Sequence, residues 1–206
     1  MNASRLLFSV PLALGLFLGG CASDASDDVA DGASAVSATE AITLANYVSH
    51  PKIKAVRADV AAIDAAGYAK AENPGCDGTN TKWTDASGKI RKVLSEGGEG
   101  DGSGSTTAYY GANGKLRFLF FTFTGSSPDD GGVATSQSRV YFDDRGQPFW
   151  QVSRDASSPL NAPPPDMSKA ADTITPDDAK YVVGDGHDAT YENPETWYAG
   201  RGCGEP

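Results

Sequence analysis

Hydrophobic residues are spaced in three different ways along the chain, and each spacing predicts a different structure. The first is an unbroken run, Leu6 to Leu18, in which Ser9 is the only polar side chain. A helix of this length rises about 20 Å, which is too short for the roughly 30 Å hydrocarbon layer of a membrane. With Arg5 before the run and small residues after it, this is the layout of a secretory signal peptide. We expect residues 1–20 to be removed.

The second spacing is helical and begins after Pro51. Its apolar members recur every three or four residues: Ile53, Val56, Val60 and Ile63. This predicts a helix with one face packed on a core, with Pro51 in its first turn and Ser49 or His50 as its N-cap. A capping-box pattern predicts another short helix over about 39–48. We therefore expect two N-terminal helices.

The third spacing alternates apolar and polar residues, as in β-strands. Aromatic residues, a polar turn that ends in glycine, and renewed alternation occur three times, over 82–90, 109–116 and 141–149. Glycine supplies the positive φ that tight hairpin turns need. Three hairpins in series predict an antiparallel meander of about five to six strands.

These patterns together predict an α+β fold in a single globular domain over 39–206. The N-terminal helices pack on the meander, and residues 184–206 form a loop-rich C-terminal tail. Residues 21–38 are small and acidic, with no Lys, Arg or large apolar side chain. Nothing in them offsets the entropy cost of ordering the backbone, so they read as a flexible tether.

The tetrapeptide Leu18-Gly19-Gly20-Cys21 resembles the lipobox of bacterial lipoproteins. The resemblance implies cleavage before Cys21, a diacylglycerol on its sulfur, and a membrane as partner. Ala22, rather than Asp, at the next position implies the outer membrane if the cell is Gram-negative. The alternative is an ordinary signal peptide that ends near a cysteine.

If Cys21 carries lipid, Cys76 and Cys203 remain as an even pair in an oxidising compartment, which predicts a disulfide that closes most of the domain. The alternative is two free or metal-binding thiols, but a zinc site would lack ligands in a chain with only two histidines. The glycine- and aspartate-rich loop 97–105 fits neither common calcium-loop pattern. We expect no metal and no cofactor.

The charge balance limits the partners. The chain has 17 basic and 27 acidic side chains and a formal net charge of −10. Binding to a phosphate backbone needs clustered Lys and Arg, so nucleic acid is excluded as a partner. No phosphate-binding loop or nucleophile elbow is present in the sequence.

Four aromatic residues flank the predicted hairpin turns: Trp83, Tyr109, Tyr110 and Trp150. We favour cross-strand packing for them, and the alternative is a contact face for an envelope protein or a glycan. The first functional hypothesis is a lipid-anchored cell-envelope protein that acts as a non-enzymatic binding or structural module. The rival is a lipid-anchored envelope hydrolase that uses His187 and nearby carboxylates. A secreted inhibitor-like module is a third hypothesis.

Overall fold

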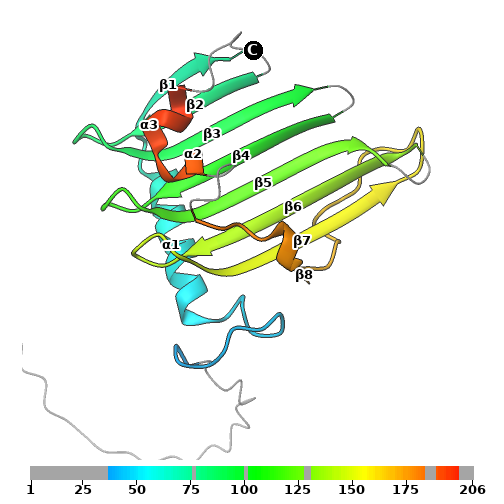
Figure 1. Ribbon diagram of the computed structural model, residues 1–206, viewed down its shortest axis with the longest axis horizontal. Helices are drawn as coiled ribbons and strands as arrows, with labels where there is room; N and C mark the ends of the chain where they lie inside the picture. Colours follow the sequence, from blue (N-terminus) through cyan, green and yellow to red (C-terminus); the bar gives the residue numbers. More distant parts are fainter. Residues whose placement is uncertain (1–36, 76–77, 100–101, 128–130, 184–188, 200–206) are drawn as a thin grey trace, which may run out of the picture. The chain divides into compact units, whose positions relative to one another are not determined.

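The computed structural model describes residues 37–75, 78–99, 102–127, 131–183 and 189–199, which lie within one unit, Ala35–Pro206. Within them, eight strands form one antiparallel sheet whose spatial order is the order of the sequence (Figure 1). The strands are β1 (Ala69–Pro74), β2 (Gly78–Thr84), β3 (Ile90–Glu99), β4 (Gly102–Tyr110), β5 (Leu116–Ser126), β6 (Val133–Phe142), β7 (Pro148–Ser158) and β8 (Thr173–Ile174).

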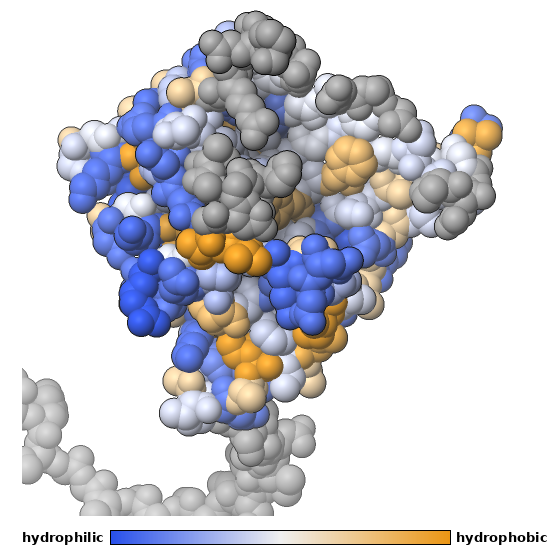
Figure 2. Space-filling view, in the orientation of Figure 1, coloured by the Kyte–Doolittle hydropathy of each residue, from blue (hydrophilic) through white to orange (hydrophobic). Residues whose placement is uncertain are grey.

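Different parts of the chain cover the two faces of the sheet. Helix α1 (Pro51–Ala65) crosses the strands on one face, and a C-terminal segment with the short helices α2 (Ala189–Glu192) and α3 (Pro194–Ala199) lies on the other (Figure 1). Figure 2 views the second face and shows hydrophobic residues in several small groups among hydrophilic ones. The sheet therefore has a core on each side, as its apolar residues on both faces require.

Helix α1 begins as its sequence predicts. His50 is its N-cap, and the Nδ1 atom of this side chain accepts a hydrogen bond from the backbone N–H of Lys52 at 3.2 Å. The other ring nitrogen therefore carries the proton and donates to the carbonyl oxygen of Glu40 at 3.1 Å. With both nitrogens bonded, the imidazole is fully buried. The buried face of the helix contains Ile53, Val56 and Ile63.

The three sequence repeats form three hairpins of the same geometry. Their turn glycines, Gly88, Gly114 and Gly146, have φ angles of 85°, 77° and 80°. Each hairpin also skips one residue in its register, three positions after the glycine. The skipped residues are Arg91, Arg117 and Phe149. A skipped residue of this kind is a β-bulge, which redirects its side chain, and here all three side chains lie on the α1 side of the sheet.

The antiparallel α+β fold is confirmed, but two details of the prediction are wrong. Residues 39–48 form turns rather than a helix. The Asn46 side chain accepts from the backbone N–H of Thr43 and donates to the carbonyl oxygen of Ala41, so it stabilises turns instead. A helix this short is also marginal on its own.

The sheet has eight strands rather than five to six. The two edge strands were missed because they lack an apolar alternation. All residues of β1 are exposed or half-buried, with Lys70 and Glu72 paired at 2.6 Å, and β8 has only two residues. Their pairing is set by the neighbouring strands rather than by their own sequence.

The described part of the C-terminal segment packs on the sheet. It buries Tyr181 and Trp197 against the sheet. The hydroxyl of buried Tyr110, in β4, donates to the carbonyl oxygen of Tyr191 at 2.7 Å. This bond fixes the segment to the middle of the sheet.

Several expectations fall on residues that the structure does not describe. These are the signal peptide, nearly all of the tether, all three cysteines and His187. None of the helices that the structure does describe is both long and apolar enough to span a membrane.

Replacing Gly114 with Ala tests the backbone of the repeated turn. An added Cβ would meet no atom within 4 Å, so the cost comes from the positive φ alone. We expect the free energy of unfolding to fall by about 1–2 kcal/mol, measured by urea denaturation. Ala112→Ser, at an exposed position of the same turn, is the matched control and should change it by less than about 0.5 kcal/mol. Equal stability of the two variants would contradict the turn geometry.

Candidate functional site

The four aromatic candidates are divided between the two faces of the sheet. Tyr110 is fully buried on the face of the C-terminal segment. Trp83, Tyr109 and Trp150 lie on the α1 face, where Tyr109 is 7% exposed and the two tryptophans are half-buried. The tyrosines therefore offer almost no surface to a partner.

The three aromatics on the α1 face belong to one line of paired residues across six strands. This aromatic row consists of Trp83, Lys92, Tyr109, Phe118, Tyr141 and Trp150. Ring centroids are 6.0 Å apart for Tyr109 and Phe118 and 5.0 Å apart for Phe118 and Tyr141. The Lys92 ammonium lies 4.8 Å from the Trp83 ring and 5.0 Å from the Tyr109 ring. The row packs within the sheet and against α1.

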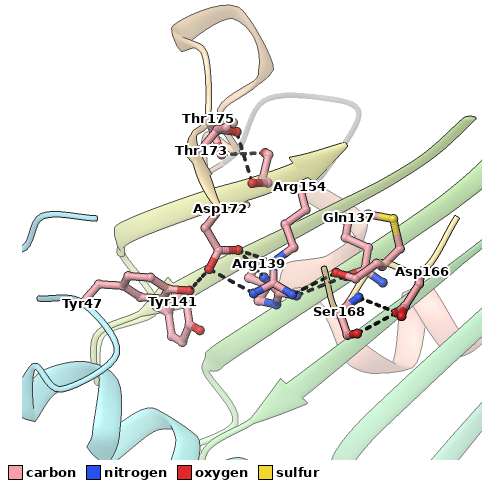
Figure 3. A network of polar contacts seen from close by, with 12 residues as sticks. Tyr47, Gln137, Arg139, Tyr141, Arg154, Asp166, Ser168, Asp172, Thr173 and Thr175 are labelled. Carbon is pink, nitrogen blue, oxygen red and sulfur yellow. Dashed lines mark hydrogen bonds and ion pairs between the residues drawn. The ribbon is translucent and has the colours of Figure 1, made fainter. Parts of the chain in front are cut away.

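Beside this row, a network of charged groups surrounds Asp172 (Figure 3). Arg139 from β6 donates to Asp172 at 2.9 Å, and Arg154 from β7 donates to both of its carboxylate oxygens. The hydroxyl of Tyr47, in the segment before α1, also donates to Asp172. Arg154 reaches the carbonyl oxygen of Met167 at 3.2 Å. One carboxylate thus connects the sheet, the segment before α1 and the loop between β7 and β8.

The electrostatics of this network suit a structural role. Burial raises the pKa of Asp172, but hydrogen bonds from Arg154 and Tyr47 and the charges of Arg154 and Arg139 outweigh it, so the pKa is lowered from 3.8. Burial and the neighbouring Asp172 carboxylate raise the pKa of Tyr47. At neutral pH the carboxylate stays charged and the phenol stays protonated. Neither group is set up to exchange a proton, and the network acts as a clamp.

A pocket of about 370 Å³ lies between the second half of α1 and the hairpin turns. Six of its ten lining residues are polar or charged, and the full set is Asp59, Ala62, Ile63, Tyr68, Arg91, Gly111, Ala112, Asn113, Arg117 and Asp144. This volume falls within the range of small-ligand sites, and several polar side chains converge on it. The pocket is our candidate functional site.

Arg117 forms one wall of this pocket. Its Nε atom donates to Asp59 at 2.9 Å, and its Nη1 atom lies 3.1 Å from Asp144 and donates to the carbonyl oxygen of Phe142 at 2.8 Å. The guanidinium is largely buried, whereas the Asp144 side chain is 89% exposed. Helix, strand and turn therefore hold the planar group in one orientation.

Arg91 forms another wall with a similar set of partners. Its Nε atom donates to the carbonyl oxygen of Tyr110 at 3.1 Å, and its Nη1 atom donates to the Tyr68 hydroxyl at 3.3 Å. The Asp85 carboxylate lies 3.5 Å away. Both guanidiniums are thus fixed by a backbone carbonyl and by at least one carboxylate.

Sequence reasoning missed this pocket, because single Arg and Asp residues are ordinary surface residues. One signal was present in the repeats. Arg91 and Arg117 stand three positions after Gly88 and Gly114, where each hairpin has its bulge. A bulge there turns the side chain toward the helix, so the arginines of two repeats meet at one site.

Other sites in the described part of the chain are poorer candidates. A hollow of about 490 Å³ near the opposite ends of the strands is lined by glycines, hydroxyl residues and one valine, without a charged side chain. Among the residues that the structure describes, no three His, Cys, Asp or Glu side chains gather where they could hold a metal ion. The arginine pocket is the better-formed polar site of the two.

Comparison with known proteins gives no assignment: no family model, curated protein or solved structure matches this chain.

Replacing Asp172 with Asn tests the clamp. The variant leaves two guanidiniums without a carboxylate, so we expect it to be less stable at pH 7 by about 2–4 kcal/mol. Because the folded pKa of Asp172 is lowered, its contribution is present above pH 3.8 and is lost as the pH falls through the folded pKa. The difference between wild type and variant in urea denaturation should therefore shrink below about pH 4.

The exposed carboxylate of Asp155, on β7, provides the matched control. Asp155→Asn should leave the free energy of unfolding within about 0.5 kcal/mol of wild type at every pH. A difference for Asp172→Asn that stays constant from pH 7 to pH 2 would contradict the charged clamp.

Proposed function

We propose that the protein is a lipid-anchored cell-envelope protein that acts as a non-enzymatic binding module, with the arginine pocket as its binding site. The observation that carries this proposal is the pairing of charges in the pocket. Arg117 is held by Asp59 and Asp144, and Arg91 is held by Asp85 and the Tyr68 hydroxyl. Groups held in this way orient a ligand by hydrogen bonds, whereas proton transfer or nucleophilic attack needs an activated group.

The anchor rests on the lipobox resemblance at Leu18–Cys21. Acyl chains on Cys21 would hold the protein to the membrane, because each buried methylene contributes about 0.8 kcal/mol. The acidic residues 21–38 would then separate the binding domain from the bilayer. His187 lies outside the described residues, so the rival hydrolase stays a hypothesis.

The expected disulfide gains support from the residues near each cysteine. The Asn73 side chain donates to the carbonyl oxygens of Tyr198 and Ala199, each at 3.1 Å. Cys76 follows Asn73 by three residues and Cys203 follows Ala199 by four, so the connecting segments are long enough for the two cysteines to meet. A bridge of this kind fits an oxidising envelope compartment.

Replacing Cys21 with Ser tests the anchor. Wild-type protein should fractionate with membranes, and the variant should appear in the soluble fraction because it has no thiol to acylate. Mass spectrometry of the purified wild type should show an amino-terminal peptide that starts at Cys21 and carries a diacylglycerol. A bare Cys21, or residues 1–20 still attached, would contradict the proposal.

Peptide mapping without reduction tests the Cys76–Cys203 bridge. We expect one linked peptide that separates on reduction, and a free Cys76 thiol in the variant Cys203→Ser. The variant should lose about 4–5 kcal/mol of stability, because the bridge closes a loop of more than 100 residues. Alkylation of both thiols in the unreduced wild type would show that no bridge forms.

A further inference from the structure

The geometry of the arginine pocket points to a neutral saccharide unit as its ligand, bound through several hydroxyl groups. This inference rests on the proposed binding function and specifies the chemistry of the ligand. It follows from four properties of the pocket: its charge balance, its lining residues, its unused donors and acceptors, and its width.

The charge balance argues against an anionic ligand. Two guanidiniums face three carboxylates, since Arg91 is paired with Asp85 and Arg117 is paired with both Asp59 and Asp144. An anion would have to compete with these aspartates for the same arginines. A site for phosphate or carboxylate instead offers guanidiniums that have no acidic partner.

The lining also argues against an apolar ligand. The aliphatic side chains of the pocket are those of Ala62 and Ile63 on α1 and of Ala112 in a hairpin turn, and two of these three are single methyl groups. Burying an apolar ligand here would remove charged side chains from water without replacing their hydrogen bonds, which is costly. The ligand must therefore bring its own polar groups.

Donors and acceptors remain available side by side. In the described part of the chain, the Nη2 atom of Arg91 and that of Arg117 have no hydrogen-bond partner. The Tyr68 hydroxyl accepts from Arg91 and keeps its own proton free to donate. One carboxylate oxygen of Asp59 and one of Asp144 make none of the contacts with Arg117 described above.

A hydroxyl group satisfies such a site because it donates and accepts at the same time. One ligand hydroxyl can accept from a guanidinium and donate to the carboxylate paired with it. A ring that carries several hydroxyls can do this at both arginines at once. Neither a simple anion nor a simple cation offers both functions.

The width of the pocket suits one sugar ring. Arg91 is on β3 and Arg117 is on β5, so their backbones are two strand spacings, or about 10 Å, apart. The side chains of both arginines and of Asp59 line the space between, together with Tyr68, whose ring centroid lies 5.8 Å from the Arg91 guanidinium. A pyranose with its hydroxyls can bridge this gap, and the partly open mouth admits the rest of a glycan.

The test is saturation-transfer NMR and calorimetry on purified full-length protein in a detergent without sugar groups. The probes are glucose, galactose, N-acetylglucosamine and their β-1,4-linked disaccharides, with glucuronate and inorganic phosphate as anionic probes. We expect at least one neutral saccharide to bind, and we expect neither phosphate nor glucuronate to displace it. Arg117→Lys, which keeps the charge but loses the planar fork, should weaken binding about tenfold or more.

Two further variants separate a binding effect from a folding effect. Asp144→Asn changes an 89% exposed side chain, so the fold should be unaffected while saccharide binding weakens about tenfold. Asp155→Asn, an exposed carboxylate on β7 outside the pocket, should leave saccharide binding unchanged.

Three results would overturn the inference. These are no binding of any neutral saccharide, tighter binding of phosphate or glucuronate than of the neutral sugars, and saccharide binding that is unchanged in both pocket variants. The Cys21→Ser fractionation is independent of all three. A failed sugar test with intact anchoring would reject only the ligand, and soluble wild-type protein that binds sugar would reject only the anchor.

Discussion

The packing of α1 on the aromatic row is the interaction on which the rest of this structure depends. The row presents one large side chain from each of six neighbouring strands, and the helix crosses it. Polar groups of α1 pair with members of the row: Arg57 donates to the Tyr141 hydroxyl at 3.2 Å, and Asp64 accepts from Lys92 at 2.7 Å. A sheet with one bare apolar face is unstable in water, so the helix stabilises the sheet by burying that face. The polar contacts also fix the position of the helix on the sheet. The Asp172 clamp and the arginine pocket then form at opposite ends of the helix.

The repeated hairpin explains how one local structure serves both packing and binding. Each repeat places an aromatic residue in the row and a bulged residue beside it on the same side of the sheet. In the third repeat the bulged residue is Phe149, which packs with the core beneath the start of α1. In the first two repeats it is an arginine, which lines the pocket beneath the end of α1. The same backbone geometry thus produces core at one end of the helix and a polar cavity at the other.

The features that the sequence predicted correctly are those set by short-range chemistry. The α1 cap at His50, its apolar spacing and the glycine turns all depend on residues within a few positions of each other. Strand β1 and strand β8 depend on a partner strand, so their own residues carry little signal. The pocket could not be predicted because Asp59, Arg91 and Arg117 meet only after the helix has folded back over three strands. Alternation places the adjacent Tyr109 and Tyr110 on opposite faces of the sheet, but it does not show that both are buried.

A meander in sequence order ends in two free edges, and β1 forms one of them. An unpaired strand edge is a template on which another chain can add its own strand, and proteins suppress this with charge, proline and short strands. Here Lys70 and Glu72 place opposite charges along the edge, and Pro74 lacks the N–H that a new neighbour would need. At the other edge, β8 is only two residues long, so it offers a new strand little backbone of its own to pair with. The sheet is therefore protected against growing from molecule to molecule, which matters most where many copies are crowded together.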